Sequence, residues 1–355
     1  MTLADRELVA LAVDGDQDAL TEVVRRVQDP VYRLALRMTG HPSDAEDATQ
    51  EILIRVLTRL AGFRGDAALV TWAYRIATNH LINLSRRPRH ELLAFDGYRQ
   101  DLLDGLAAPA YTGPGGELFA EEIRLLCTQA LLQCLDRPGR AAYVLADVIG
   151  LSGDEAAWIL DITPAAYRKR LERARRQVRT ALTDRCGLLD SAAPCRCGKR
   201  ITYAVQKGRL GPNGPGYTRL PTTPDVTRQT ATSLSQLRDV GELLRSHPRY
   251  AAPQAKVDAV LALARSGRYP DVLPRSGAAD GAADASLARL GDLAVGGGVE
   301  ADVVERTGGH GEPDRGESGA TAVDLGVVVA LSRSERSDDQ PDDEHPASGP
   351  HRYLR

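Results

Sequence analysis

The stretch DEAAWILDITPAAYRKRLERARRQVRTAL, residues 154–182, contains two segments with the apolar spacing of amphipathic helices. A tight connection at 161–163 separates them, and Pro164 suits the first turn of the second helix because an N–H has no partner there. This is the spacing of a helix-turn-helix, whose second helix can enter the major groove of DNA. The stretch therefore predicts an all-α domain that binds DNA.

The second of these helices has a one-sided charge. Its cations stand against a single acidic residue, Glu172, and are Arg168, Lys169, Arg170, Arg173, Arg175, Arg176 and Arg179. Like charges three and four residues apart destabilise a helix unless an anion compensates them, and a solvated surface helix usually mixes signs. The pattern therefore favours contacts with phosphates and guanine edges over a plain solvated face.

The whole chain has 355 residues with 5% aromatic residues, 33 glycines and 20 prolines, so we expect two or three domains and some segments that do not fold. Its net charge of −3 hides an uneven distribution. Residues 274–355 carry 16 acidic and 8 basic residues, which leaves the rest of the chain at about +5 by subtraction. The front is therefore basic, and 274–355 is predicted to be a mostly disordered acidic tail.

Targeting signals are not readable in the sequence. It has no run of about 18 apolar residues, and its first residues, MTLADRELVALAVDGD, show no basic region before an apolar stretch. Neither a membrane span nor a signal peptide is predicted. We expect a cytoplasmic protein.

Residues 5–87 are predicted to be nearly continuous helix. Pro30 is an expected kink or break, and GHPSD at 40–44 is a turn that ends in Ser43 or Asp44 as a helix N-cap. A helix, DAEDATQEILIRVLTRL, follows with acidic residues first and arginines last, as the helix dipole prefers. After the loop GFRGD, a third helix is predicted over 67–87, where Pro88 ends it.

The run TWAYRIATNHLINLSRR, residues 71–87, combines aromatic, amide and cationic groups in one helix. Trp72, Ile76 and Leu84 are suited to a core. The other faces carry groups that can stack on unpaired bases and contact phosphates, namely Tyr74, Arg75, Asn79, Asn83, Arg86 and Arg87. This surface is typical of a site for single-stranded nucleic acid.

The order of these parts resembles the extracytoplasmic-function (ECF) sigma factors of bacterial RNA polymerase, over about residues 5–185. The residues that match the family's clamp-binding helix are Asp44, Ala45, Glu46, Asp47, Gln50 and Glu51. Those that match the family's −10 segment are Phe63, Arg64, Gly65, Trp72, Tyr74, Arg75, Ile76, Ala77 and Asn79. The helix-turn-helix stands where the family has its −35 reader.

The resemblance and the composition together imply an all-α fold with two helical domains on a flexible linker, a small helical extension and a disordered tail. The expected parts are region 2 at 1–87, a flexible linker at 88–119, region 4 at 120–185, a cysteine-containing segment at 186–205, a linker at 206–230, a helical extension at 231–273 and the tail at 274–355. We expect the extension to be a hairpin of two short helices split at 247–253.

The implied function is that of a sigma factor, which binds the polymerase clamp and flap, recognises the −10 and −35 promoter elements and melts DNA. The −10 set is Phe63, Arg64, Trp72, Tyr74, Arg75, Asn79, Asn83, Arg86 and Arg87. The −35 set is Thr163, Tyr167, Arg168, Lys169, Arg170, Arg173, Arg175 and Arg176. Melting is driven by binding energy, so we expect neither an enzyme nor a required cofactor. An anti-sigma factor is a further expected partner.

The chain has five cysteines, an odd number that disfavours a disulfide framework. Cys186, Cys195 and Cys197 lie close in sequence and could ligate a structural zinc ion, which takes four ligands. The fourth would be remote, such as His247 or His90, or come from a partner. A thiol switch activated by Arg196 and Lys199, or inert packing, are the alternatives.

Three other functions compete with this one. A stand-alone helix-turn-helix regulator would bind duplex DNA without polymerase. A nucleic-acid enzyme is disfavoured because its usual metal and phosphate motifs are missing from the sequence, and the carboxylate cluster of Asp44, Glu46, Asp47 and Glu51 falls on a helix N-terminus, where capping explains it. A protein-only scaffold would start no transcript. Separately, the 231–273 extension could pack on a DNA-binding domain and restrain it.

Overall fold

The computed structural model describes residues 4–84, 94–211, 216–223 and 239–266. They lie in the first of the two units into which the chain divides, Met1–Gly296. The described residues form helices and two isolated β-bridges, which agrees with the all-α prediction. The predicted acidic tail, Arg86, Arg87 and His90 lie outside the described residues.

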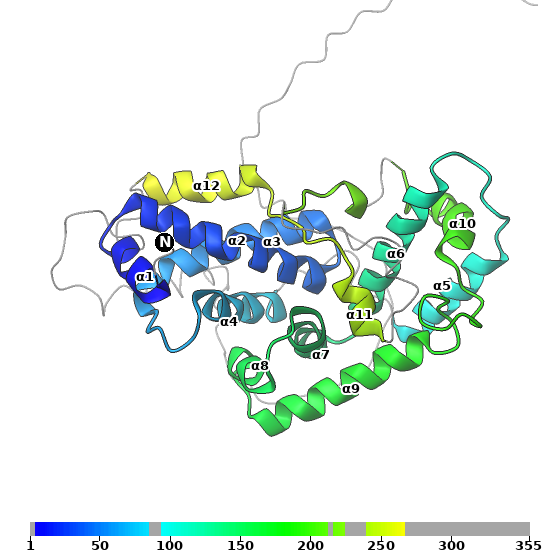
Figure 1. The fold of residues 1–355 in the computed structure, drawn as a ribbon, viewed down its shortest axis with the longest axis horizontal. Helices are drawn as coiled ribbons and strands as arrows, with labels where there is room; N and C mark the ends of the chain where they lie inside the picture. Colours follow the sequence, from blue (N-terminus) through cyan, green and yellow to red (C-terminus); the bar gives the residue numbers. More distant parts are fainter. Residues whose placement is uncertain (1–3, 85–93, 212–215, 224–238, 267–355) are drawn as a thin grey trace, which may run out of the picture. The chain divides into compact units, whose positions relative to one another are not determined.

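The first domain is a bundle of α1 (Asp5–Val13), α2 (Gln17–Thr39), α3 (Pro42–Thr58) and α4 (Leu69–Ile82), with a short 3-10 turn, η1 (Leu60–Gly62), before α4 (Figure 1). Valines and leucines at helical spacing on α2 are fully buried and form the core of the bundle: Val23, Val24, Val27, Val31 and Leu34. Asp16 begins α2 because its carboxylate accepts the N–H groups of Asp18 and Ala19.

Two local expectations for this domain are corrected by the structure. Pro30 does not break α2, which runs on to Thr39. The N-cap of α3 is His41 rather than Ser43 or Asp44, because Pro42 occupies the first turn, where its missing N–H costs nothing. Gly40 makes the sharp turn between the helices with a φ of 72°, which a side chain would disfavour.

The second domain contains α6 (Gly116–Gln133), α7 (Arg137–Tyr143), the π-helical turn η2 (Val144–Ile149), α8 (Gly153–Leu160) and α9 (Pro164–Leu182). A capping box between Ser152 and Glu155 begins α8. Asp161 ends α8 in a left-handed conformation with φ 55°, and the Thr163 hydroxyl caps α9. The helix-turn-helix predicted at 154–182 is therefore present with its turn at the expected residues.

The flexible linker predicted at 88–119 is wrong over part of its length. Residues 95–107 form α5 (Phe95–Ala107), which buries Tyr98 and Leu102. The three prolines and five glycines of 88–119 suggested a linker, but most of them lie outside the helix. The apolar residues between them keep helical spacing, and α5 packs against α6 and α10 (Ile201–Gln206).

The C-terminal part of the described chain continues with two 3-10 turns, η3 (Cys197–Arg200) and η4 (Tyr217–Arg219), and with α11 (Val240–Arg245) and α12 (Gln254–Arg265). The break between α11 and α12 falls where it was predicted. They do not form an autonomous hairpin, because α12 packs along α2 and α3 whereas α11 packs against η2 of the second domain (Figure 1). We call residues 217–223 and 239–265 the clasp.

Candidate promoter and polymerase interface

The acidic face predicted to bind polymerase lies on α3. Ala45, Ala48 and Ile52 turn into the bundle core, which leaves the acidic positions on the outer side. Asp47 and Glu51 are exposed, while Asp44, Glu46 and Gln50 are half-buried. The clasp meets this face, because Lys256 Nζ on α12 lies 2.9 Å from Asp47 Oδ1.

The aromatic part of the predicted −10 surface is formed where η1 leads into α4. The rings of Phe63 and Trp72 pack edge to face with their centroids 5.5 Å apart, and both are half-buried. Arg64 is exposed beside them, and Asn79 and Asn83 are exposed further along α4. The structure therefore brings an aromatic edge, a cation and amides to the part of the bundle where the sequence predicted them.

Tyr74 is the exception among the predicted stacking residues. It is 7% exposed and belongs to the bundle core, where burial raises the pKa of its hydroxyl. In this arrangement its ring is not accessible to a base. The structure thus gives Tyr74 a core position, and its contact with DNA stays a prediction.

Arg75 is held by the helix-turn-helix domain rather than left free for phosphate. Its guanidinium donates to Trp158 O at 2.6 Å and to Asp161 Oδ1 at 2.8 Å. It also lies 4.7 Å from the centroid of the Trp158 ring. In this arrangement the turn of the helix-turn-helix covers part of the predicted −10 helix.

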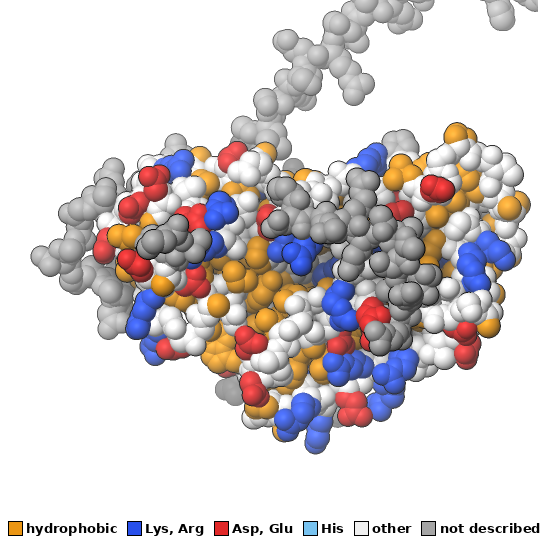
Figure 2. Space-filling model, in the orientation of Figure 1, with side chains coloured by type: hydrophobic (Ala, Val, Ile, Leu, Met, Phe, Trp, Pro, Cys, Tyr) orange, Lys and Arg blue, Asp and Glu red, His pale blue; other side chains and the backbone are white. Residues whose placement is uncertain are grey.

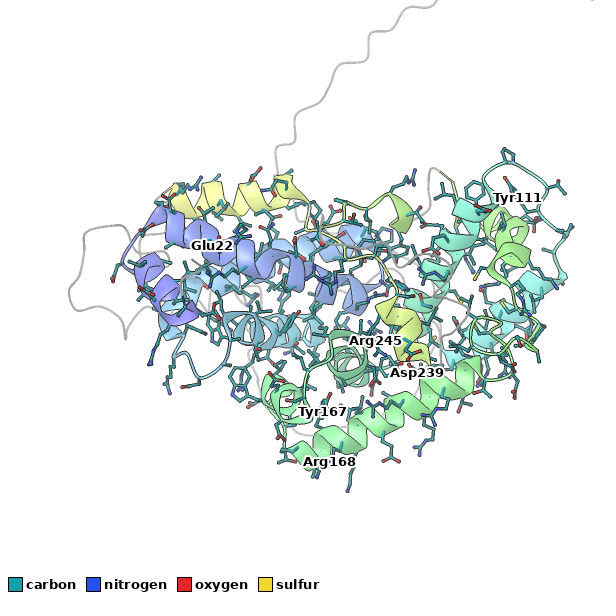
Figure 3. All side chains as sticks on the ribbon, in the orientation of Figure 1. Glu22, Tyr111, Tyr167, Arg168, Asp239 and Arg245 are labelled. Atoms are coloured by element: carbon teal, nitrogen blue, oxygen red, sulfur yellow. The ribbon has the colours of Figure 1, made fainter. Side chains whose placement is uncertain are left out.

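The cations of α9 form the second DNA-binding surface. Leu171, Ala174 and Val178 face the core, so the basic residues at the other positions face outward. Arg168, Lys169, Arg173 and Arg176 are exposed, and Arg170 is half-buried. Lys and Arg side chains gather along this helix (Figure 2), and Arg168 lies on its outer edge (Figure 3).

Besides Thr163, whose hydroxyl caps α9, two further members of the predicted −35 set have structural contacts. Tyr167 is 1% exposed, and its hydroxyl donates to Ala142 O at 3.1 Å. Burial raises the pKa of Tyr167 to about 12, so this tyrosine is a core residue and its assignment to DNA is corrected. Arg175 pairs with both carboxylate oxygens of Asp147, at 2.8 and 2.6 Å, and thereby joins α9 to η2.

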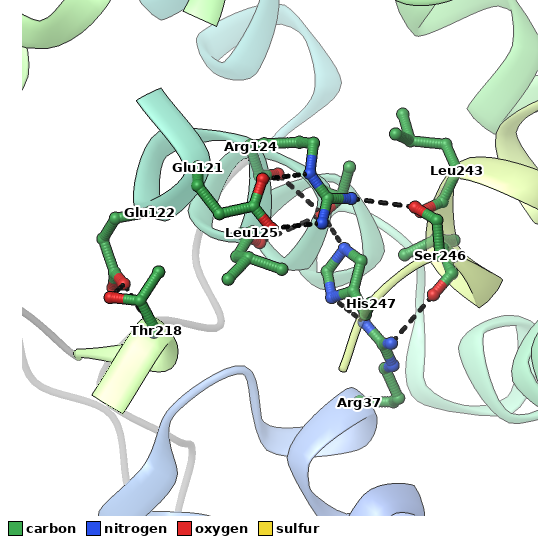
Figure 4. Close-up of polar contacts among 11 residues, drawn as sticks. Arg37, Glu121, Glu122, Arg124, Leu125, Thr218, Leu243, Ser246 and His247 are labelled. Carbon is green, nitrogen blue, oxygen red and sulfur yellow. Dashed lines mark hydrogen bonds and ion pairs between the residues drawn. The ribbon is translucent and has the colours of Figure 1, made fainter. Parts of the chain in front are cut away.

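A buried polar cluster joins both domains to the clasp, and His247 is at its centre (Figure 4). Arg37 Nη1 of α2 donates to His247 Nδ1 at 2.7 Å, and His247 Nε2 lies 2.6 Å from Thr128 Oγ1 of α6. Since arginine can only donate, Nδ1 accepts and Nε2 carries the proton. Arg37 Nη2 also donates to Leu244 O at 2.9 Å, and Arg124 Nη1 donates to Ser246 Oγ at 2.9 Å.

Glu122 of α6 fixes the other end of the clasp. This carboxylate is 6% exposed and accepts three hydrogen bonds, from Tyr217 N at 2.8 Å, Thr218 N at 2.7 Å and Thr218 Oγ1 at 2.8 Å. The hydroxyl of Tyr217 then donates to Gly40 O of the first domain. The clasp therefore contacts both domains through buried, charge-assisted hydrogen bonds.

The cluster predicts a pH dependence for His247. Burial, and then Arg37 and Arg124, hold the pKa of His247 well below its ordinary value of 6.5. In the unfolded chain the imidazole of His247 is protonated below about pH 6.5, whereas in the folded chain it stays neutral. We therefore expect the free energy of unfolding to fall as pH drops below 6.5. The expected slope is about 1.4 kcal/mol per pH unit relative to a His247→Gln variant, measured by urea unfolding between pH 5 and pH 8. Equal slopes in the two proteins would contradict the buried neutral imidazole.

Sequence reasoning missed the residues that hold the domains together. Arg37 and Arg124 are 7% and 4% exposed, and Arg140 is 1% exposed with its guanidinium bonded to backbone carbonyls that include Met38 O and Leu132 O. The available signal was an arginine inside an apolar run, as in VYRLALRMTG. An arginine is rarely buried unless its N–H donors are all hydrogen-bonded.

The structure brings Cys186, Cys195 and Cys197 to one cavity, where Cys127 of α6 joins them. His247 is not available as a fourth ligand, because its two ring nitrogens are hydrogen-bonded to Arg37 and Thr128. As the side chains stand, the described ranges contain no group of three or more His, Cys, Asp and Glu residues that could hold a metal ion. The zinc hypothesis therefore requires a rearrangement of these thiols.

Two family models match the chain. The model of sigma-70 region 2 matches residues 23–91, and the model of sigma-70 region 4 matches residues 125–178. The first range includes most of α2 and all of α3 and α4, and the second includes most of the block that ends in the helix-turn-helix. The chain is also 34% identical over 182 residues to the ECF RNA polymerase sigma-E factor of Escherichia coli K12, and the match covers 50% of this chain and 93% of that protein.

The chain belongs to the ECF sigma factor family. Members of this family are initiation factors of RNA polymerase and not enzymes, which confirms the functional prediction at that level. Another relative, the ECF RNA polymerase sigma factor SigE of Mycolicibacterium smegmatis, is 37% identical over 175 residues; the match covers 47% of this chain and 64% of SigE. The relatives thus match about half of this ECF sigma factor.

Two solved structures are also similar. CnrH in complex with the cytosolic domain of CnrY has 26% identity and a TM-score of 0.38, and covers 51% of this chain and 97% of that chain. The sigma factor RpoE in complex with the anti-sigma factor NepR from Bartonella quintana has 18% identity and a TM-score of 0.32, and covers 45% of this chain and 93% of that chain. In this ECF sigma factor, none of the helices that the structure describes is long and apolar enough to cross a membrane.

Proposed function

We propose that this ECF sigma factor is held in a closed form by its own clasp and opens when it binds core RNA polymerase and promoter DNA in the cytoplasm. One observation carries the proposal: the surfaces assigned to polymerase and to the −10 element are both in contact with other parts of the same chain. Lys256 pairs with Asp47, and Trp158 and Asp161 hold Arg75. Neither surface can be fully engaged until these contacts separate.

The proposed contact residues follow from what remains exposed. Core polymerase binds the outer side of α3, through Asp44, Glu46, Asp47, Gln50 and Glu51. The −10 element binds Phe63, Arg64, Trp72, Asn79 and Asn83, with Arg75 joining them once the helix-turn-helix domain moves away. The −35 element binds the outer face of α9, with Arg168, Lys169, Arg173 and Arg176 as its main cations.

The contacts differ in how strongly they favour the closed form. The Lys256–Asp47 pair is exposed, with side chains 38% and 64% accessible, and such pairs stabilise a protein by about 0 to 1 kcal/mol. The bonds of Glu122 and His247 are buried and cost more to break, because the groups left behind would be unpaired. Opening therefore depends on the buried cluster, and ligands must bind the open form with correspondingly higher affinity.

A direct test combines capture by core polymerase with run-off transcription from a promoter library. The full chain is expected to copurify with core enzyme and to start transcripts at a defined set of promoters. A stand-alone regulator would bind duplex DNA without polymerase and start no transcript. An anti-sigma factor stays a proposed partner, and its binding would be measured by whether it suppresses the same transcripts.

A narrower prediction concerns α9. Replacing Arg168 and Arg173 with alanine should weaken binding to duplex promoter DNA and flatten its salt dependence, by roughly 0.9 units of slope for each phosphate that the variant no longer neutralises. The measurement is a fluorescence anisotropy titration at four salt concentrations. Lys207→Ala, which removes a cation beside α10, is the control and should leave the slope unchanged. An unaltered slope in the double variant would remove α9 as the DNA reader.

A further inference from the structure

Four of the five cysteines line one small cavity beside α6. Cys127 comes from α6 itself, and Cys186, Cys195 and Cys197 come from the segment that follows α9. The space open to the centre of a water-sized sphere is about 20 Å³. That is room for one water or one ion and too little for an organic ligand.

The loop CGLLDSAAPCRC, residues 186–197, is folded so that its thiols converge. Cys186 and Cys195 form an isolated parallel β-bridge, with Gly187 N donating to Cys195 O at 3.0 Å and Cys195 N donating to Arg185 O at 3.1 Å. Gly187 permits this approach, because a Cβ there would lie 2.4 Å from Cys195 O.

The turn after Cys186 fixes this cysteine at the cavity wall. Leu189 N and Asp190 N both donate to Cys186 O, at 3.0 Å each. Cys186 therefore lines the cavity from a hydrogen-bonded turn.

Buried cations face the same cavity. Arg200 is 6% exposed and lines the cavity, and its Nε has no hydrogen-bond partner although it is buried. Arg124, which is 4% exposed, lines another side. Arg200 pairs with Asp101 at 2.7 Å, and its Nε lies against Gly105 of α5, where an added Cβ would be 2.6 Å away. Arg124 pairs with Glu121 at 2.5 Å. Four thiolates around a divalent ion carry a net charge of about −2 and would lie near both guanidinium groups.

We propose that Cys127, Cys186, Cys195 and Cys197, which line one cavity with room for a single ion, bind one Zn²⁺ ion. The site goes beyond the transcription function and does not depend on it. The ligand set is complete within the chain, so neither a histidine nor a partner protein is required. Tetrahedral coordination by four thiolates at about 2.3 Å is the usual form of a structural zinc site.

Among the described residues, these thiols are not at metal-binding spacing as they stand, so binding requires a local rearrangement. The Cys127 sulfur lies 3.0 Å from the hydroxyl of Tyr98 on α5, and rotation of this side chain would release it toward the other three. The four S–H protons pass to solvent as the four Zn–S bonds form, so no oxidant or reductant takes part. Metal binding is consequently favoured by higher pH.

A thiol switch fits the same residues less well. Oxidation by a peroxide requires access to the sulfur, and Cys195 is only 7% exposed. The cavity has room for a single ion. The cavity is also lined by Thr128 and Leu243, so a bound ion would brace the side of α6 that the clasp contacts.

The test measures metal in the full chain, with Cys134 providing a matched control. Cys134 lies at the end of α6, where its thiol donates to Ala130 O at 3.4 Å, and it is not one of the cavity residues. Protein purified without chelator should contain about one zinc per chain by mass spectrometry of the metal, and so should Cys134→Ser. Cys127→Ser and Cys195→Ser should lose most of this zinc while circular dichroism confirms that they stay helical.

A second measurement keeps the proposal testable if a variant unfolds. The apo protein titrated with Co²⁺ should develop the intense charge-transfer absorption of thiolate coordination, and Cys134→Ser should match it. The proposal is overturned if the wild-type chain retains no zinc and gives no such absorption. Equal zinc in Cys127→Ser, or a Cys186–Cys195 disulfide in the purified protein by peptide mass spectrometry, would overturn it as well.

Discussion

Replacing Trp72 with alanine is expected to reduce open-complex formation about 5- to 150-fold while binding to duplex promoter DNA changes little. The range corresponds to the loss of one base stack, worth about 1 to 3 kcal/mol. Trp72 is half-buried against Phe63, so one part of its ring is anchored and the rest is free to meet an unpaired base. Permanganate reactivity of the melted thymines measures the effect directly.

Tyr74→Phe is the matched control for this experiment. Tyr74 lies two residues from Trp72 on α4 but is 7% exposed, and its ring packs in the core. We expect permanganate reactivity to stay within about twofold of the wild-type value, because phenylalanine keeps this ring and its packing and removes only the hydroxyl. Thermal unfolding of both variants shows whether the domain is intact. Equal permanganate reactivity in Trp72→Ala and wild type would contradict the stacking role.

The contrast between these two residues shows what the sequence of α4 and α9 could predict. Tyr74 has the spacing of a core stripe with Ala77 and Leu81, and all three are buried. Tyr167 begins a similar stripe with Leu171, Ala174 and Val178 on α9, and these too are buried. Helical spacing alone therefore predicted the burial of both tyrosines. Chemical type, which suggested stacking or DNA contact, was the weaker guide.

The clasp could not be predicted in the same way. Its anchors pair residues far apart in sequence, such as Arg37 with His247 and Glu122 with Thr218. No periodicity relates such positions, and each looked like an ordinary polar residue on a helix or in a loop. The cysteines are similar: Cys186, Cys195 and Cys197 formed a visible motif, whereas Cys127 joined them only through the packing of α6 against η3.

The clasp itself should open when Glu122 is replaced by glutamine. The carboxylate accepts from two backbone N–H groups and one hydroxyl, and an amide has one acceptor oxygen fewer and directs an NH₂ group toward those donors. Hydrogen bonds to a charged group contribute about 1.5 to 3 kcal/mol each, so losing one shifts the equilibrium toward the open form about 10- to 150-fold. Hydrogen exchange of residues 217–223 and 239–265 should accelerate accordingly.

The functional consequence is measured at limiting core polymerase, where the closed form competes with assembly. Glu122→Gln should start more transcripts than the wild-type chain under these conditions and converge with it when core is in excess. Glu117→Gln makes the same chemical change at an exposed position of α6 and should behave like the wild type.

If Glu122→Gln lost binding to duplex promoter DNA, the variant would have damaged the helix-turn-helix domain. Tyr217→Phe, which removes only the bond to Gly40 O, would then take its place. Faster exchange of the clasp without any gain in transcription would show that the clasp fastens the two domains without restraining them, and the closed form would then have no regulatory role.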